Sequence, residues 1–128
     1  MPHFSARSYA VLDTVHPQLQ QLFRRVVLQH DCTILPDGGK RTEARQAELV
    51  AAGKSQTMHS KHLTGHAVDV APYPIDWEDW KRWYAFGGYV RGIAEGMEIN
   101  VRWGGDWDGD WSFIDQRFHD LPHWELRI

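Results

Sequence analysis

The chain has 128 residues, 42% of them hydrophobic and 24% charged, with a formal net charge of −3. This length is close to the commonest size of a single domain, so we expect residues 1–128 to fold as one domain around one core. The lone Cys32 cannot form an internal disulfide. The acidic balance argues against nucleic acid as a partner, because proteins that bind nucleic acids usually carry a basic face.

The start of the chain, MPHFSARSYAVLDTV, has no basic leader followed by an apolar run and a small-residue cleavage site. We therefore expect no secretory signal. No segment approaches the ~20 consecutive apolar residues that a membrane-spanning helix needs. These patterns predict a protein that is made in the cytoplasm, stays there unless another protein releases it, and has no stable membrane association. A monomer is expected.

The first half of the chain favours helices. Apolar residues at helical spacing predict the first two, and Pro17 stands at a favourable first-turn position of the second. Thr42 as a cap and Gly53 as a stop frame the third. These three helices are expected at residues 5–15, 17–30 and 42–53. Between the second and the third, residues 33–35 form a strand candidate that ends in the turn sequence Pro-Asp-Gly-Gly.

Strands enter in the second half of the chain. Residues 66–71 alternate and are rich in small and β-branched residues, which favours a strand, and Pro72 ends it. A long helix is expected at residues 76–93, with Asp76 as its cap. Two further strands are expected at residues 101–103 and 123–127. This order predicts an α+β domain with helices first and a small antiparallel sheet later.

The histidines are the first sign of a metal site. The chain has eight, and five of them form two groups along the sequence: His59, His62 and His66, then His119 and His123. Histidine is the commonest zinc ligand, and catalytic zinc sites use three protein ligands and leave one position open. The spacing of His62 and His66 fits the helical HExxH pattern of metalloproteases, but Leu63 stands in place of the glutamate base. That interpretation therefore fails.

A strand over residues 66–71 gives a different geometry. Successive side chains of a strand point to opposite faces, so Asp69 lies on the face opposite to His66, between small neighbours that leave room for a metal. A turn at Thr64-Gly65 would bring His62 back beside Asp69.

The segment SKHLTGHAVD at residues 60–69 fits the pattern S-x-H-x-x-G-x-A-x-D. In this segment the chain resembles the zinc D-Ala-D-Ala peptidase family, which includes the vancomycin-resistance D,D-peptidases and the L-alanyl-D-glutamate endolysins of tailed phages. It is most similar to the endolysins, through the runs RTEARQ at 41–46, WGGDW at 103–107 and DLPH at 120–123. The resemblance implies the hedgehog and D,D-peptidase-like α+β fold, with helices packed on a small antiparallel sheet.

The same resemblance implies a zinc site with three ligands: His62, Asp69 and His123. It implies that Asp120 is the acid/base carboxylate, and that Arg41 lies near the substrate, where its planar fork binds a carboxylate or steadies an oxyanion. A solvated surface arginine is the alternative for Arg41, and a turn residue is the alternative for Asp120. Glu125 is the alternative base, because it lies two residues along the same strand face as the last histidine.

Four further residues are expected to have supporting or surface roles. The hydroxyl of Ser60 is expected to fix the loop that carries the first metal-binding histidine. The pattern does not require His59, His66 or His119, and we expect them to be structural or surface residues, with His66 near the rim of the cleft.

Two further features stand outside the zinc pattern. Asp106, Asp108 and Asp110 alternate around Gly109, and closely spaced loop carboxylates bind calcium in some proteins. A full EF-hand pattern is missing, so the sequence favours a plain acidic turn over a calcium site. The chain also has seven tryptophans, which form either core or a stacking surface for a sugar or peptide.

The resemblance predicts a zinc-dependent L-alanyl-D-glutamate endopeptidase that cuts the stem peptide of bacterial peptidoglycan and acts as a phage endolysin in host lysis. Release from the host cytoplasm to the wall through a holin pore is implied by the resemblance alone. The alternatives are a D-Ala-D-Ala carboxypeptidase of the same fold and a non-catalytic zinc domain that binds the wall. An acidic residue at position 120 favours an enzyme over a binding domain.

Overall fold

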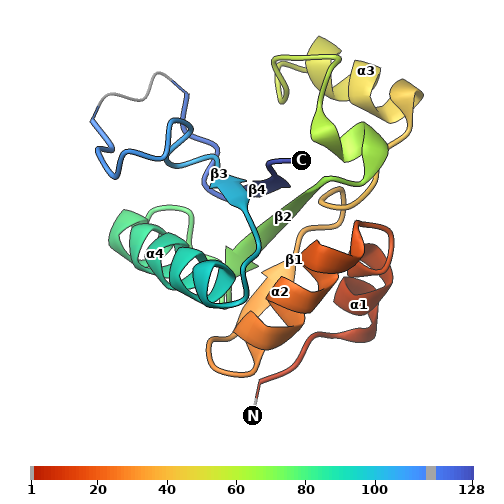
Figure 1. Ribbon diagram of the computed structural model, residues 1–128. Helices are drawn as coiled ribbons and strands as arrows, with labels where there is room; N and C mark the ends of the chain where they lie inside the picture. Colours follow the sequence, from red (N-terminus) through yellow and green to blue (C-terminus); the bar gives the residue numbers. More distant parts are fainter. Residues whose placement is uncertain (1, 115–117) are drawn as a thin grey trace.

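The fold is built on a four-stranded antiparallel sheet with strand order β1-β2-β4-β3, shown in Figure 1. A computed structural model describes residues 2–114 and 118–128. The strands are β1 (Cys32–Ile34), β2 (Ala67–Pro72), β3 (Val101–Trp103) and β4 (His123–Leu126). All four lie within one residue of their predicted bounds, and the predicted α+β class is confirmed.

The helices form where helical spacing of apolar residues predicts them, but they are shorter or shifted. They are α1 (Ala6–Leu12), α2 (Pro17–Val27), α3 (Glu43–Ala51), α4 (Trp80–Gly96) and the short 3-10 helix η1 (Lys61–Thr64). Figure 1 shows α1, α2 and α4 gathered on one side of the sheet, with α3 apart from them. Thr42 caps α3 as predicted, because its hydroxyl accepts a hydrogen bond from the Arg45 amide at 3.1 Å. Among the described residues, no helix is long and apolar enough to cross a membrane.

The predicted start of the long helix is wrong. The helix α4 begins at Trp80, and its cap is Asp79 instead of Asp76. Asp76 is held outside the helix in a turn, since its carboxylate accepts from the Glu78 amide at 3.0 Å and its carbonyl accepts from the Trp83 indole at 2.9 Å. Asp76 and Asp79 are both residues of a type that commonly caps helices. The hydrogen bond from the Trp83 indole holds Asp76 in the turn, and the helix begins after Asp79.

The two faces of the sheet have different chemistry. Val68 and Val70 of β2, with Trp124 and Leu126 of β4, are fully buried in the main hydrophobic core. The core includes Phe23 of α2, whose ring lies 6.1 Å from that of Trp124. Because side chains alternate along a strand, Asp69, His123 and Glu125 share the opposite face. The helices therefore cover one face, and the other face is left for polar groups.

Gly104 sits where no side chain fits. A Cβ atom at this position would lie 2.1 Å from the backbone oxygen of Asp120, and the Gly104 amide donates to the His123 carbonyl at 2.9 Å. The WGGDW run thus allows β3 to lie directly against the segment that leads into β4.

Replacing Gly104 by Ala should destabilise the protein by about 1–3 kcal/mol, because the added methyl forces the backbone apart. Thermal unfolding should show a fall in Tm of several degrees. Gly92→Ala is the matched control: a Cβ at Gly92 meets nothing within 4 Å, and alanine favours the helix. Equal Tm values for the two variants would show that the close approach at Gly104 is unimportant.

Candidate metal centre

A cleft of about 510 Å³ opens over the polar face of the sheet. Its walls come from β2 and β4, from η1 and the segment before it, and from the segment around residue 120. The cleft contains every residue that the sequence pattern assigns to metal binding or catalysis: Arg41, His62, Asp69, Asp120 and His123.

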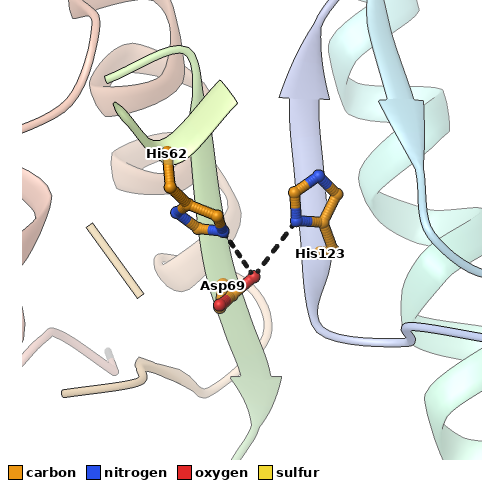
Figure 2. A group of neighbouring side chains, drawn as sticks. All are labelled: His62, Asp69 and His123. Carbon is orange, nitrogen blue, oxygen red and sulfur yellow. Dashed lines mark hydrogen bonds and ion pairs between the residues drawn. The ribbon is translucent and has the colours of Figure 1, made fainter. Parts of the chain in front are cut away.

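His62, Asp69 and His123 meet at the base of this cleft. The Asp69 Oδ1 atom lies 3.2 Å from His62 Nε2 and 3.4 Å from His123 Nδ1. Figure 2 shows both rings directed at the Asp69 carboxylate, one from η1 and one from β4. One ligand atom from each residue lies within 4.8 Å of the others, and all three residues are buried. Two imidazole nitrogens and a carboxylate oxygen therefore converge as a possible metal-binding triad.

The electrostatics of the triad favour a cation. Burial raises the pKa of Asp69, but the charges and hydrogen bonds of His62 and His123 outweigh this and lower it overall. Burial lowers the pKa of His123, yet hydrogen bonds to Asp69 and Glu125 raise it to about 9. Carboxylates thus surround the second imidazole, and the pocket stabilises positive charge.

Local structure fixes His62 in place. The Ser60 hydroxyl accepts a hydrogen bond from the His62 amide at 3.2 Å, as expected for a residue that holds this loop. Gly65 ends η1 with φ of 77°, a left-handed conformation that turns the chain back beside Asp69. The His62 Nδ1 atom lies 2.9 Å from the Gly39 carbonyl, which can only accept. Nδ1 therefore carries the hydrogen, and Nε2 faces the triad.

His123 is fixed by the sheet and by Glu125. Cross-strand pairing places His123 directly opposite Asp69, and its Nε2 atom lies 2.9 Å from Glu125 Oε1. Glu125 also accepts from Arg102 at 2.9 Å and lies 3.6 Å from the Lys61 ammonium. Burial raises the pKa of Glu125, but His123 and then Arg102 lower it to about 2. Glu125 is thus engaged on the ring nitrogen that faces away from the triad, where it orients the ring.

Asp120 lies at the edge of the triad. Its Oδ2 atom lies 4.0 Å from His123 Nδ1, the nitrogen that faces Asp69. Burial and the charge of Asp69 raise the pKa of Asp120, against the opposing effects of nearby cations. A tight turn holds it there, because the His123 amide donates to the Asp120 carbonyl at 3.0 Å.

Arg41 is a partly buried partner of Asp69, with 12% of its side chain exposed, and not a solvated surface arginine. One terminal nitrogen donates to Asp69 Oδ2 at 3.0 Å, and the other donates to Gln46 Oε1 at 3.1 Å. Gln46 is itself fully buried and donates to the Thr57 carbonyl at 2.7 Å. Sequence reasoning missed the role of Gln46, although the RTEARQ run contained both residues.

Comparison with known proteins identifies the family of the chain. The family model for phage L-alanyl-D-glutamate peptidases matches residues 1–127. The chain belongs to this family. It is 35% identical to the L-alanyl-D-glutamate peptidase of Escherichia phage T5 over 121 residues, which cover 88% of this chain and 87% of that one. The resemblance found in the sequence is confirmed.

Two further relatives extend the comparison. The L-alanyl-D-glutamate peptidase of Listeria phage A118 is 36% identical over 83 residues, which cover 65% of this chain and 26% of the relative. The crystal structure of the Serratia marcescens L-Ala D-Glu endopeptidase ChiX matches with a TM-score of 0.77 and 37% identity, over 98% of this chain and 90% of that one. Fold and sequence therefore point to the same family.

The histidines outside the triad lie elsewhere in this family member. His66 contacts His16, with ring centroids 5.3 Å apart, and it does not line the cleft, so its expected place at the rim is wrong. His59 is exposed and does line the cleft. His119 lies 3.3 Å from the Tyr84 hydroxyl.

The acidic loop forms a second cluster. Ligand oxygens of Asp106, Asp108 and Asp110 lie within 4.8 Å of one another. Asp106 is buried, and its Oδ2 atom accepts from Arg91 at 2.9 Å and from the Trp111 amide at 2.8 Å. Its Oδ1 atom is buried without a hydrogen-bond partner. The loop is therefore organised around a buried carboxylate and is more than a plain exposed turn.

Proposed function

We propose that this protein is a zinc-dependent endopeptidase that hydrolyses the L-alanyl-D-glutamate bond in the stem peptide of peptidoglycan. The observation that carries the proposal is the convergence of His62, Asp69 and His123 in an open cleft, beside the Asp120 carboxylate. Membership of a family of peptidases with this named specificity supports it. Hydrolysis of this bond would let the protein act as an endolysin in host lysis.

The donor set fits zinc. Two imidazoles and one carboxylate, with room for a fourth ligand, are typical of catalytic zinc sites. The second ring nitrogen of each histidine is also hydrogen-bonded, in His62 to the Gly39 carbonyl and in His123 to Glu125. Zinc-binding imidazoles usually have such a hydrogen bond, which orients the ring. Zinc bound there would polarise the substrate carbonyl and lower the pKa of water toward ~7.

The other residues of the cleft then have distinct tasks. Asp120 takes the proton from the attacking water and returns it to the departing amine, a role that its raised pKa favours. Arg41 holds Asp69 in place through its hydrogen bond and adds positive charge where the substrate carbonyl develops negative charge.

Mass spectrometry of fragments released from purified peptidoglycan tests the reaction. The proposal predicts new carboxyl ends on L-alanine and new amino ends on D-glutamate. Release of free D-alanine would instead show the D-Ala-D-Ala carboxypeptidase. Binding to the wall with no released fragment from the zinc-loaded protein would show the non-catalytic domain.

The assignment of Glu125 as a supporting residue has its own test. Glu125→Gln removes the charge that faces His123, so metal affinity should fall about 10–100-fold. Competition with a chromophoric chelator would measure this change. Unchanged metal affinity together with a complete loss of hydrolysis would make Glu125 the base instead.

Calcium at the acidic loop is a separate proposal. The buried Oδ1 atom of Asp106, beside the exposed carboxylates of Asp108 and Asp110, offers oxygen ligands of the kind that calcium prefers. Isothermal calorimetry should detect one calcium ion with a Kd on the order of 10⁻⁴–10⁻³ M. Asp108→Asn should abolish the signal, and an absence of binding at millimolar calcium in the unaltered protein would rule it out.

The partners of the protein and the place where it acts form a further proposal. We propose that the protein acts as a monomer on peptidoglycan, with no nucleic-acid partner and no stable membrane association. We further propose that it is made in the host cytoplasm and reaches the wall through a holin or a similar route. Expression in bacteria with and without a co-expressed holin would test this, since lysis should depend on the pore.

A further inference from the structure

Two exposed tryptophans lie outside both the core and the metal centre. Trp83, Trp103 and Trp124 are at most 2% exposed and form part of the interior, whereas Trp77 is 56% exposed and Trp80 is 68% exposed. A contiguous exposed apolar surface of this kind marks an interaction or ligand site. Trp111 is also 58% exposed but packs against the Arg91 guanidinium, 3.8 Å from its ring centroid. Trp77 and Trp80 are thus the exposed tryptophans that share one surface.

The two exposed rings line an apolar groove of about 810 Å³, here the aromatic groove. Its aromatic and apolar lining includes Trp77, Trp80, Tyr84, Phe113, Leu121 and Pro122. None of its described lining residues is a lysine or an arginine. Its size lies within the ~300–1,000 Å³ typical of small-molecule sites. The lining also includes Ile114, His119 and Asp120, so the groove suits a ligand with apolar faces and no negative charge.

Packing holds the walls of the groove in place. The Trp77 ring stacks on the buried Trp83 ring, with centroids 4.8 Å apart and planes inclined by 22°. The Tyr84 ring lies 4.9 Å from Phe113, and its hydroxyl lies 3.3 Å from a ring nitrogen of His119. A groove that is already formed loses little conformational entropy when it binds a ligand.

The groove lies next to the catalytic cleft, because Asp120 lines both. A substrate held at Asp120 therefore lies within reach of the groove. The cleft by contrast is rich in charged groups, with the cations Arg41, Lys54, Lys61 and Arg102 beside the carboxylates of Asp69, Asp120 and Glu125. The site thus offers a part that contains cations and an aromatic part whose described lining has no lysine or arginine, and the two parts meet at Asp120.

The substrate has the same two parts, an argument that rests on the proposed function. On one side of the L-alanyl-D-glutamate bond, the stem peptide carries free carboxylates. On the other side, the alanine joins through a single lactyl group to an uncharged muramic acid sugar of the glycan strand. One extended residue spans ~3.3–3.6 Å, so the sugar lies within about two residue lengths of the bond that is cut.

We propose that the aromatic groove binds the glycan strand, with the apolar face of a sugar ring against Trp77 and Trp80. An indole has a large apolar face and an N–H at its edge, which matches a sugar that has apolar faces and a polar rim. The carboxylates of the stem peptide fit the cations of the cleft instead. The chain would then recognise the junction between glycan and peptide and not the peptide alone.

The test compares two substrates. One is the free stem peptide, and the other is the same peptide attached to its N-acetylglucosamine and N-acetylmuramic acid disaccharide. The unaltered enzyme should have the higher kcat/KM on the disaccharide-peptide, mainly through a lower KM. Trp80→Ala should lower the ratio of the two kcat/KM values about tenfold, the size of one lost aromatic contact. Lys81→Ala, a change at the next residue of α4, should leave the ratio unaltered.

Direct binding gives a second measurement. The disaccharide without peptide should shift the indole N–H signals of Trp77 and Trp80 in NMR spectra and leave that of the buried Trp124 in place. No shift, together with an unaltered ratio in Trp80→Ala, would overturn the glycan assignment while the proposed function stands. If Trp80→Ala instead abolishes binding to phosphatidylethanolamine and phosphatidylglycerol vesicles with the ratio unaltered, the groove is a lipid contact. Failure to cut either substrate would overturn the proposed function itself.

Discussion

Replacing Asp120 by Asn should lower the rate of peptidoglycan hydrolysis about 10²–10⁴-fold, equivalent to about 3–5 kcal/mol of transition-state stabilisation. The reason is that the amide keeps the shape of the side chain but cannot take a proton from water. The Asp120 carboxylate lies 4.0 Å from His123 Nδ1, at the edge of the triad and outside it. Metal content and Tm should therefore hardly change. Stopped assays on labelled peptidoglycan, with metal analysis of the same samples, would measure both quantities.

Glu125→Gln is the matched control for this substitution, because it also replaces a carboxylate of the cleft by its amide. In contrast to Asp120→Asn, this variant should bind the metal more weakly. Its hydrolysis should largely recover when excess zinc is added. Near-full activity in Asp120→Asn, with Glu125→Gln inactive at saturating zinc, would exchange the two roles. The hydrogen bond of Glu125 to the outward-facing nitrogen of His123 argues against that exchange.

Much of the site could be predicted from the sequence because it depends on local rules. The alternation of residues 66–71 placed Asp69 opposite the core face, and the left-handed Gly65 provides the turn that returns His62. These features need only strand geometry and one glycine. Tertiary packing then brings His123 into register with Asp69. The family pattern implied His123 as a ligand, but local rules could not supply this pairing.

Other features depend on contacts between distant residues, and the sequence did not predict them. The anchoring of Arg41 by Gln46 depends on the burial of Gln46 beside the loop at Thr57. The choice of Asp79 as the helix cap depends on an indole that reaches back to the Asp76 carbonyl. Such contacts are decided by which side chains the complete fold buries together, so spacing along the chain does not reveal them.

Replacing His62 by Ala should remove most of the bound zinc and all detectable hydrolysis. The three ligands share one site, so the loss of one imidazole leaves only two donors, and zinc sites of this kind use three. The exposed His59 lines the same cleft but is not part of the described triad, so it should not replace the lost ligand. Metal analysis after dialysis, combined with a turbidity assay on bacterial walls, would measure the two losses.

The matched control is His66→Ala, four residues along the same segment. His66 lies against His16 and bonds to the Thr64 hydroxyl at 2.7 Å, away from the cleft. This variant should keep its zinc and most of its activity. Equal loss of zinc in the two variants would mean that the ligand assignment is wrong. Loss of activity in His62→Ala with zinc retained would instead mean that His62 acts on the substrate, and that the metal is held without it.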